Sequence, residues 1–226
     1  MNVSGLRSAQ PRFTLHPINP NFPSKPFNPQ LHSARMNRDA TDEELMLAYA
    51  AGDAAAFDVL YTRHRGPVFR FVRRQVRDDG AAQEIFQDVW LRLINARARY
   101  VPTANFTTWV FTIAHHRMMD YFRSSGQHVE YVAFEPDHED DGPAIDPPAA
   151  ASERPDGMLD RKRMASRIIA ALEELPPAQR EAFMLQQEGE LTVEDIASIT
   201  GTNRETAKSR LRYALAKLRR DLQDLR

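Results

Sequence analysis

Residues 191–222 read LTVEDIASITGTNRETAKSRLRYALAKLRRDL in a chain of 226 residues. Thr192, with an acidic residue at position 195, predicts the capped start of a short helix. Gly201 can adopt the left-handed conformation that ends such a helix. Thr202 with Glu205 forms a second capping pattern, so we predict two helices joined by a turn of about three residues. This arrangement is a helix-turn-helix.

The second helix of this motif separates its residues by face. Small and apolar side chains recur at helical spacing and are expected to face the core: Ala207, Leu211, Ala214 and Leu218. Polar and basic side chains occupy the first turns, where a recognition helix meets the major groove. We predict that six of them bind DNA: Asn203, Arg204, Glu205, Lys208, Ser209 and Arg212. A helical hairpin with a solvated basic face is the alternative for the same pattern.

Helix start signals also occur near the beginning of the chain. Thr41 with Glu44 predicts a capping box, and Asp53 predicts the start of a further helix. We expect Gly66–Pro67 to break or bend that further helix, because proline lacks a backbone N–H group.

Two more helices are predicted before the middle of the chain. Residues 81–95 repeat apolar side chains at helical spacing, and Asn105 predicts the cap of a helix that reaches about residue 123. The apolar side of this last helix is expected to hold Trp109, Val110, Ile113 and Tyr121. Because no segment alternates with the period of two typical of a strand, the sequence predicts an all-α fold.

Composition divides the chain into two small helical domains, residues 39–124 and 158–226. Six prolines between positions 11 and 29 predict that residues 1–38 form a disordered tail. Residues 125–157 combine Pro, Gly, Ala and acidic side chains, which is typical of a flexible linker. The absence of cysteine excludes disulfides and zinc fingers, and no segment approaches the ~18–20 apolar residues of a membrane span.

Charge is strongly segregated, although the formal net charge is only −1. Residues 63–77 hold six arginines and no acidic residue, and residues 203–220 hold seven basic residues and one glutamate. Between them, residues 127–160 hold ten acidic residues and one arginine. Two basic segments joined by an acidic one argue against a protein that coats DNA uniformly.

The helix that ends near residue 123 combines aromatic, polar and basic side chains. This composition suits unpaired DNA, because bases stack on aromatic rings while cations hold phosphates. The candidate residues, with one from the preceding loop, are Tyr100, Phe106, Trp109, His116, Asp120 and Arg123. Core packing is the alternative for Trp109. His115 and His116 are adjacent on a helix and have no suitable ligand four positions on, so we expect no metal and no other cofactor.

Four motifs follow one another along the chain: AQEIFQDVWLRL at 82–93, FTTWVFTIAHHRMMDYFR at 106–123, LPPAQREAF at 175–183 and TAKSRL at 206–211. In this order they resemble the extracytoplasmic-function (ECF) sigma factors of the sigma-70 family. The resemblance implies a sigma-2-like domain at 39–124 and a sigma-4-like domain at 158–226. It implies a non-enzymatic protein that binds core RNA polymerase, directs it to the −10 and −35 elements of promoters and promotes melting.

The resemblance also implies partners and residue roles. A polymerase-docking helix would bind a coiled coil of the β′ subunit, with contacts from Glu84, Gln87, Asp88 and Trp90, and the second domain would meet the β flap. Tyr100 matches the place where the family captures a flipped −10 base. His116, Asp120 and Arg123 match other −10 contacts. The cytoplasm is the implied location, and an anti-sigma factor is a further implied partner.

Two positions depart from the family pattern. His116 stands where the family often has asparagine, and Tyr213 stands where it often has a basic residue. These departures bear on the base preference at −10 and on the phosphate contacts at −35.

Two other functions are compatible with the residues alone. One is a stand-alone helix-turn-helix transcriptional activator, in which residues 40–124 would form a sensor or dimerisation domain. The other is an enzyme that uses His115 and His116. The helix at 82–93 discriminates against the activator, which needs no polymerase-docking surface. Gly-rich phosphate loops, paired catalytic carboxylates and nucleophile–base motifs are missing from the sequence, so we do not expect an enzyme.

Overall fold

The computed structural model describes residues 40–76, 78–126 and 157–223. Within these ranges the chain forms eight α-helices, one short 3-10 helix and no strand, so the all-α prediction is confirmed. The predicted tail and nearly all of the predicted linker lie outside the described residues. No helix in the described ranges is both long and apolar enough to cross a bilayer.

The N-terminal domain packs four α-helices around one apolar core. They are α2 (Asp42–Ala50), α3 (Ala54–Gln75), α4 (Asp79–Ala96) and α5 (Phe106–Ser124), with a 3-10 helix, η1 (Arg97–Arg99), before the loop that leads into α5. The predicted capping box of α2 is confirmed: the Glu44 N–H donates to Thr41 Oγ1 at 3.2 Å, and the Thr41 N–H donates to Glu44 Oε2 at 3.0 Å. Asp53 caps α3 as predicted.

α3 continues through Gly66–Pro67 instead of breaking there. Proline inside a helix costs roughly 3 kcal/mol, because it removes one hydrogen bond and crowds the preceding turn. Directly beyond it, Val68, Phe71 and Val72 are 0% exposed, and each buried side chain of this size contributes ~1.5–3 kcal/mol. Tertiary packing therefore outweighs the local penalty.

The buried side of α5 differs from the predicted one. Its buried apolar residues are Phe106, Val110, Phe111, Ala114, Met118 and Phe122. Of the predicted set only Val110 belongs to them, and Trp109, Ile113 and Tyr121 are partly buried against the core. The prediction assumed one covered side, whereas α5 packs against α4 on its own domain and against α7 and α8 of the next.

The C-terminal domain contains the predicted helix-turn-helix. Its helices are α6 (Gly157–Glu173), α7 (Pro177–Gly189), α8 (Val193–Thr200) and α9 (Arg204–Asp221). Thr192 caps α8 in a box with Asp195, and Gly201 ends α8 at a φ of 64°. The second predicted capping box is wrong, because Asn203 rather than Thr202 caps α9 and accepts from the Thr206 N–H at 2.7 Å. All four predicted core residues of α9 are buried.

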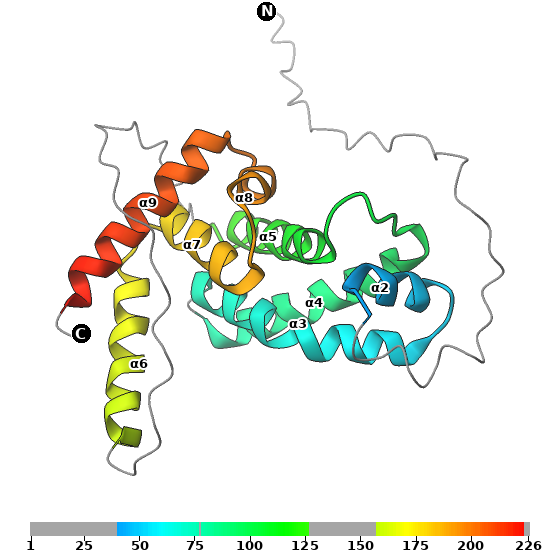
Figure 1. Cartoon of the computed structure of the whole chain (residues 1–226), viewed down its shortest axis with the longest axis horizontal. Coiled ribbons are helices and arrows are strands. Elements are labelled where there is room, and N and C mark those ends of the chain that lie inside the picture. The colour runs from blue at the N-terminus through cyan, green and yellow to red at the C-terminus, as the bar shows by residue number, and fades with distance from the viewer. Residues whose placement is uncertain (1–39, 77, 127–156, 224–226) are drawn as a thin grey trace, which may run out of the picture.

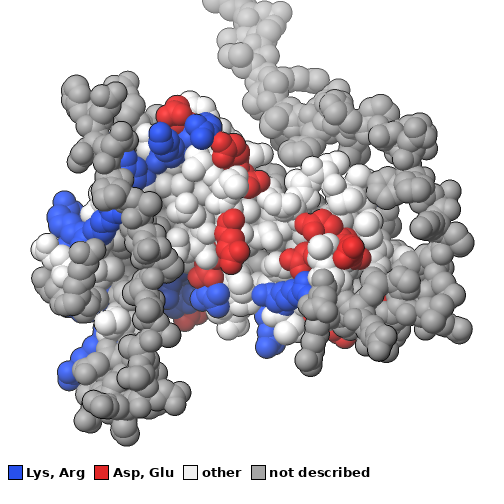
Figure 2. All heavy atoms as spheres, in the orientation of Figure 1, with Lys and Arg blue, Asp and Glu red and all other residues white. Residues whose placement is uncertain are grey.

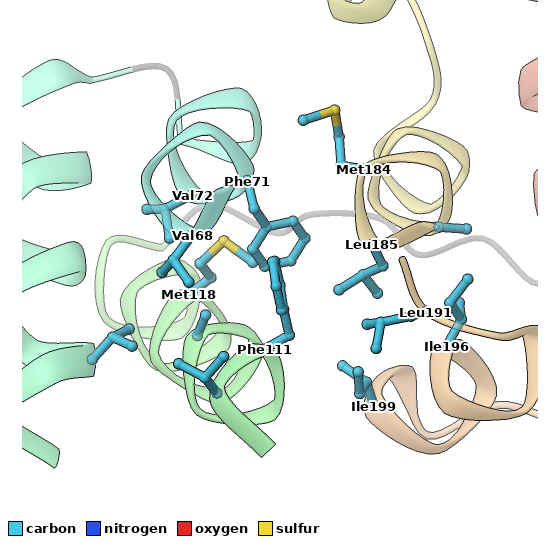
Figure 3. Packing of buried hydrophobic residues seen from close by; sticks show 14 of the residues in the cluster. Val68, Phe71, Val72, Phe111, Met118, Met184, Leu185, Leu191, Ile196 and Ile199 are labelled. Carbon is cyan, nitrogen blue, oxygen red and sulfur yellow. The ribbon is translucent and has the colours of Figure 1, made fainter. Parts of the chain in front are cut away.

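The two domains lie against each other. α7 packs along α3, and α8 packs against α5 (Figure 1). Between them, Phe71 and Phe111 of the N-terminal domain point toward Leu185 and Leu191 of the C-terminal domain (Figure 3). One continuous apolar core therefore includes residues of both domains.

Candidate nucleic-acid and polymerase interfaces

The first turns of α9 present polar side chains to solvent. The six residues predicted there are all at least partly exposed: Asn203, Arg204, Glu205, Lys208, Ser209 and Arg212. Lys and Arg side chains follow α9 on the face drawn in Figure 2. The backbone N–H groups of this first turn can also meet a phosphate. A helix-turn-helix reads a major groove with exposed basic and amide groups at the start of its second helix, and α9 has this arrangement.

Two of these side chains already have partners within the domain. Asn203 uses its Oδ1 as the cap of α9, which leaves its amide N–H groups as donors for a base. The Arg204 guanidinium pairs with Glu194 of α8 and lies 3.6 Å from the Glu205 carboxylate. Because these charges are exposed and screened by water, exchanging them for DNA costs little.

His116, Asp120 and Arg123 form a ridge on α5, because they are three or four positions apart on one face. His116 and Arg123 are exposed, and Asp120 is partly exposed. Burial alone would raise the pKa of the Asp120 carboxyl, but hydrogen bonds from Arg123 and Arg117 outweigh burial and lower it. Asp120 is therefore an ionised acceptor within a basic surrounding at neutral pH.

His116 is electrically neutral at pH 7. Partial desolvation, together with electrostatic interactions with His115, Arg92 and Arg123, outweighs the opposing effect of the Asp120 carboxylate and lowers the pKa of His116 below its ordinary value of 6.5. A neutral imidazole offers one N–H donor and one nitrogen acceptor, and an asparagine amide likewise offers both donor and acceptor. The histidine therefore keeps the hydrogen-bonding character of the asparagine that the family often has at this position.

Tyr100 and Trp109 form a partly exposed aromatic pair at the start of α5. Their ring centroids are 4.9 Å apart, and Trp109 lies 6.0 Å from Phe106 in an edge-on arrangement. Phe106 is 0% exposed, so it supports this pair from the core. Burial, followed by the charges of Glu43 and Asp42, raises the pKa of Tyr100 to about 12, so its ring carries a neutral phenol. The two rings are tilted by 51° to each other, so each offers its own flat apolar face on which a base can stack.

The start of α5 is held by a residue that sequence reasoning missed. The Asn105 side chain makes no cap hydrogen bond, contrary to the prediction. Instead, the Phe106 N–H donates to Glu43 Oε1 of α2 at 2.6 Å, a partner 63 positions away. A carboxylate at a helix N-terminus is favourable, because it meets unpaired N–H groups and the positive end of the helix dipole. The acidic first turn of α2 was visible in the sequence, but no local pattern assigns its partner.

Asp42, the neighbour of Glu43, fixes α2 to α3. Asp42 accepts from Arg63 Nη1 at 2.7 Å and lies 2.6 Å from His64 Nε2. Burial would raise the pKa of Asp42, but the hydrogen bonds from His64 and Arg63 outweigh burial and lower it. The His64 ring packs 5.0 Å from the Phe106 ring. The aromatic pair at the start of α5 is thus supported by a polar network from α2 and α3.

α4 presents a polar face and joins α5 through an ion pair. Glu84 and Gln87 are exposed, as a docking surface requires. Asp88 is partly exposed and binds Arg117 of α5. Leu91, which sequence reasoning missed, is 55% exposed one turn beyond Gln87 and gives this polar face an apolar centre.

Trp90 lies beneath that face. It is only 5% exposed and its ring contacts those of Phe57, Tyr61 and Phe86. Of the four residues predicted to meet polymerase, Trp90 therefore packs under the surface while the other three reach it.

The histidine pair considered as an enzymatic or metal site is divided between two environments. His115 is buried, and its Nδ1 lies 2.7 Å from Glu181 Oε1 of α7. His116 faces solvent. The described part of the chain contains no group of three or more side chains placed to hold a metal ion.

Comparison with known proteins identifies both domains. The sigma-70 region 2 family profile matches residues 60–127, and the sigma-70 region 4 profile matches residues 165–218. ECF RNA polymerase sigma factor SigK of Mycolicibacterium vanbaalenii is 32% identical over 185 residues, which cover 80% of this chain and 88% of that protein. RNA polymerase sigma factor CarQ of Myxococcus xanthus is 31% identical over 180 residues, which cover 80% of this chain and 97% of that protein.

Solved structures share the fold. CnrH, in complex with the cytosolic domain of CnrY, has a TM-score of 0.54 at 21% identity and covers 81% of this chain and 97% of its own. The sigma factor RpoE of Bartonella quintana, in complex with the anti-sigma factor NepR, has a TM-score of 0.53 at 23% identity and covers 74% and 96%. Because relatives above 30% identity match nearly their whole length, this chain belongs to the extracytoplasmic-function group of the sigma-70 family of RNA polymerase sigma factors.

Proposed function

We propose that this chain binds core RNA polymerase through α4, reads the −10 element with α5 and the −35 element with α9, and promotes strand separation. It is a DNA-binding initiation factor and not an enzyme. One observation carries the proposal. The same chain has an exposed ridge on α5, which an ion pair joins to α4, and an exposed recognition helix in its second domain.

The polymerase surface that we propose is the outer face of α4. Glu84, Gln87 and Asp88 supply polar contacts, and Leu91 supplies an apolar one. An apolar centre within a polar rim is the usual anatomy of a protein interface. Because Asp88 binds Arg117 of α5, docking at α4 also fixes the helix that reads the −10 element.

The −10 surface that we propose combines the aromatic pair with the α5 ridge. A base leaving the duplex stacks on Tyr100 and Trp109, which exchanges one stacking interaction for another. His116, Asp120 and Arg123 then meet neighbouring bases and phosphates. Phe106 serves as support, because its ring is buried.

The −35 surface that we propose is the first two turns of α9. Lys208 and Arg212 lie four positions apart and can hold successive groups along the groove. The Arg212 guanidinium lies 5.2 Å from the Tyr213 ring centre. A cation stacked on an aromatic ring is held in place, so the tyrosine can orient Arg212 where the family often has a basic residue.

Two further proposals concern partners and location. The solved relatives CnrH and RpoE are bound to a cytosolic domain of CnrY and to an anti-sigma factor, respectively. We propose that an anti-sigma factor also binds this chain. We place the chain in the cytoplasm, because bacterial RNA polymerase works there.

Transcription from purified components tests the function. Start sites are mapped after overexpression of the chain, and templates carrying them are then transcribed with core polymerase and no other sigma factor. We expect initiation at the mapped positions, reduced by Lys208→Ala and unchanged by the matched surface variant Lys162→Ala. Failure with several polymerases and templates would overturn the proposal. A stand-alone activator would instead stimulate transcription only when another sigma factor is present.

A further inference from the structure

One arginine of α5 connects the surface proposed for polymerase with the surface proposed for the −10 element. Arg117 Nη2 binds Asp88 Oδ2 of α4, and Arg117 Nη1 lies 3.3 Å from Asp120 Oδ2. A planar guanidinium presents its N–H donors in a fixed fork, so its contact with one carboxylate constrains its contact with the other. We call these three residues, Asp88, Arg117 and Asp120, the bridge.

The surroundings of Arg117 favour one placement of its guanidinium. Its side chain is only 18% exposed, whereas the side chains of Asp88 and Asp120 are each 36% exposed. Arg117 Nε is buried and has no hydrogen-bond partner among the described residues. A buried donor without a partner is costly. The two carboxylates outweigh this cost, and they therefore determine where the guanidinium lies.

Asp120 is held at both of its carboxylate oxygens. Arg123 binds Oδ1, while Arg117 contacts Oδ2 and Arg92 Nη2 of α4 lies 3.7 Å from the same Oδ2. Arg92 and Arg123 are exposed, so water screens and exchanges with their contacts. Arg117 is the least exposed of the three cations. It is therefore the partner that fixes Asp120 in one orientation.

A carboxylate fixed in this way suits a base that carries an amino group. An ionised carboxylate has about four acceptor sites, so one arginine contact at each oxygen leaves sites for a further donor. Cytosine and adenine both offer such a donor in their exocyclic amino groups, and aspartate typically accepts from cytosine. Because the Asp120 carboxyl is ionised at neutral pH, it accepts hydrogen bonds and donates none.

We propose that Arg117 is a positioning residue that sets the base preference at the −10 element, by holding Asp120 toward an amino-bearing base and tying it to Asp88. The proposal rests on the proposed function, because Asp88 and Asp120 have their roles only on polymerase and promoter. Arg117 binds Oδ2 of Asp88, which leaves Oδ1 for polymerase. Polymerase therefore binds without breaking the bridge, and a residue of α4 influences a base that it does not touch.

Abortive initiation on a set of promoters tests the role of Arg117. Each promoter carries one base change in its −10 element, and the complete chain is used with saturating core polymerase. Asp120→Ala identifies the position where a preference for cytosine or adenine is lost. Arg117→Gln should lower the preference at that same position by about fivefold or more and leave the other positions unchanged. If Asp120→Ala alters no single position, the proposal is overturned.

A double variant separates positioning from a general structural role. If Arg117 acts through Asp120, combining Arg117→Gln with Asp120→Ala should be no worse than Asp120→Ala alone, because coupled residues are not additive. Asp88→Asn should lower the preference at the same position, even though polymerase is saturating. Additive losses, a uniform loss at every position, or an unaltered preference in Asp88→Asn would each refute the bridge.

Two further variants serve as controls. Arg117→Lys keeps the charge without the fork and should not restore the preference, so full restoration would contradict the bridging geometry. Arg73→Gln removes another arginine that joins two helices, since Arg73 Nε of α3 lies 2.5 Å from Asp79 Oδ1 of α4. It should leave the base preference unchanged, and thermal unfolding verifies that each variant is folded.

The outcome for the bridge is distinct from the outcome for the proposed function. Initiation by the wild-type chain with no other sigma factor tests the function. The ratio of initiation between two promoters tests the bridge, because this ratio is defined only where initiation occurs. Variants of Arg117 that initiate with an unchanged ratio would therefore refute the bridge and leave the proposed function standing.

Discussion

Glu43→Ala removes the carboxylate that accepts from the Phe106 N–H at 2.6 Å. The Asn105 side chain does not replace it, because it makes no cap hydrogen bond. Loss of a capping side chain costs ~0.5–2 kcal/mol, and a hydrogen bond to a charged group contributes ~1.5–3 kcal/mol. We therefore expect the first turn of α5 to lose ~1–2 kcal/mol, which changes the ratio of formed to frayed turn by about 5- to 30-fold.

Amide hydrogen exchange measures this ratio directly, because exchange in a first turn reports local opening. Exchange at the start of α5 should accelerate by that factor in Glu43→Ala. Promoter opening should slow by no more than the same factor, because Tyr100 and Trp109 stack at this turn. Polymerase binding should not change, because α4 is untouched. Permanganate reactivity of unpaired thymines measures the opening.

Glu44→Ala is the matched control. Glu44 is the next residue of α2 and caps only α2 itself, through the Thr41 N–H. Its loss should accelerate exchange in α2 and leave the start of α5 unchanged. Glu43→Gln keeps an acceptor oxygen without the charge and should lie between wild type and alanine. If Glu43→Ala and Glu44→Ala accelerate exchange at the start of α5 equally, Glu43 does not position this helix.

Four further results are expected. His116→Asn should retain −10 recognition while His116→Lys should not, because the lowered pKa of His116 keeps the ring neutral at pH 7. Abortive initiation on promoters with altered −10 elements measures this recognition. Equal activity of the two protein variants would contradict the prediction. Lys208→Ala should weaken binding to a −35 duplex about 5- to 150-fold, from ~1–3 kcal/mol, with polymerase affinity unchanged. Gln87→Arg should weaken polymerase binding in a pull-down without lowering thermal stability, and it is a cleaner probe than Asp88, which also holds Arg117. The free chain should bind promoter DNA weakly and with strong salt dependence, so tight salt-insensitive binding in a fluorescence titration would refute this expectation.

Local patterns in the sequence were sufficient to predict the helices and much of the proposed DNA-binding surface. Thr41, Asp53 and Thr192 cap the helices that they were predicted to cap, because a cap needs only a side chain and a backbone group two or three positions on. The four buried residues of α9 followed from helical spacing in the same way. The exposure of Lys208 is consistent with the same spacing, because Lys208 lies on another face of that helix.

Contacts between distant segments could not be predicted in this way. Asn105 has the residue type and position of a cap, yet the Phe106 N–H donates instead to Glu43, 63 positions before Phe106. Pro67 has the residue type of a helix breaker, yet tertiary packing keeps α3 continuous. In both cases the local preference is worth a few kcal/mol at most, and a contact invisible in the local sequence outweighs it.

Glu181 is another residue whose contacts the local sequence does not predict. In the sequence, Arg180 and Glu181 are adjacent charged residues within the motif LPPAQREAF, and no local pattern marks either of them as buried. In the structure Glu181 is 0% exposed, with His115 of the other domain as its partner. Replacing a buried hydrogen-bonded pair by apolar side chains of the same shape is often neutral or stabilising, because both polar groups lose water on burial. The contact between α5 and α7 therefore contains a buried hydrogen bond with a small net contribution to stability, which the local sequence around position 181 does not reveal.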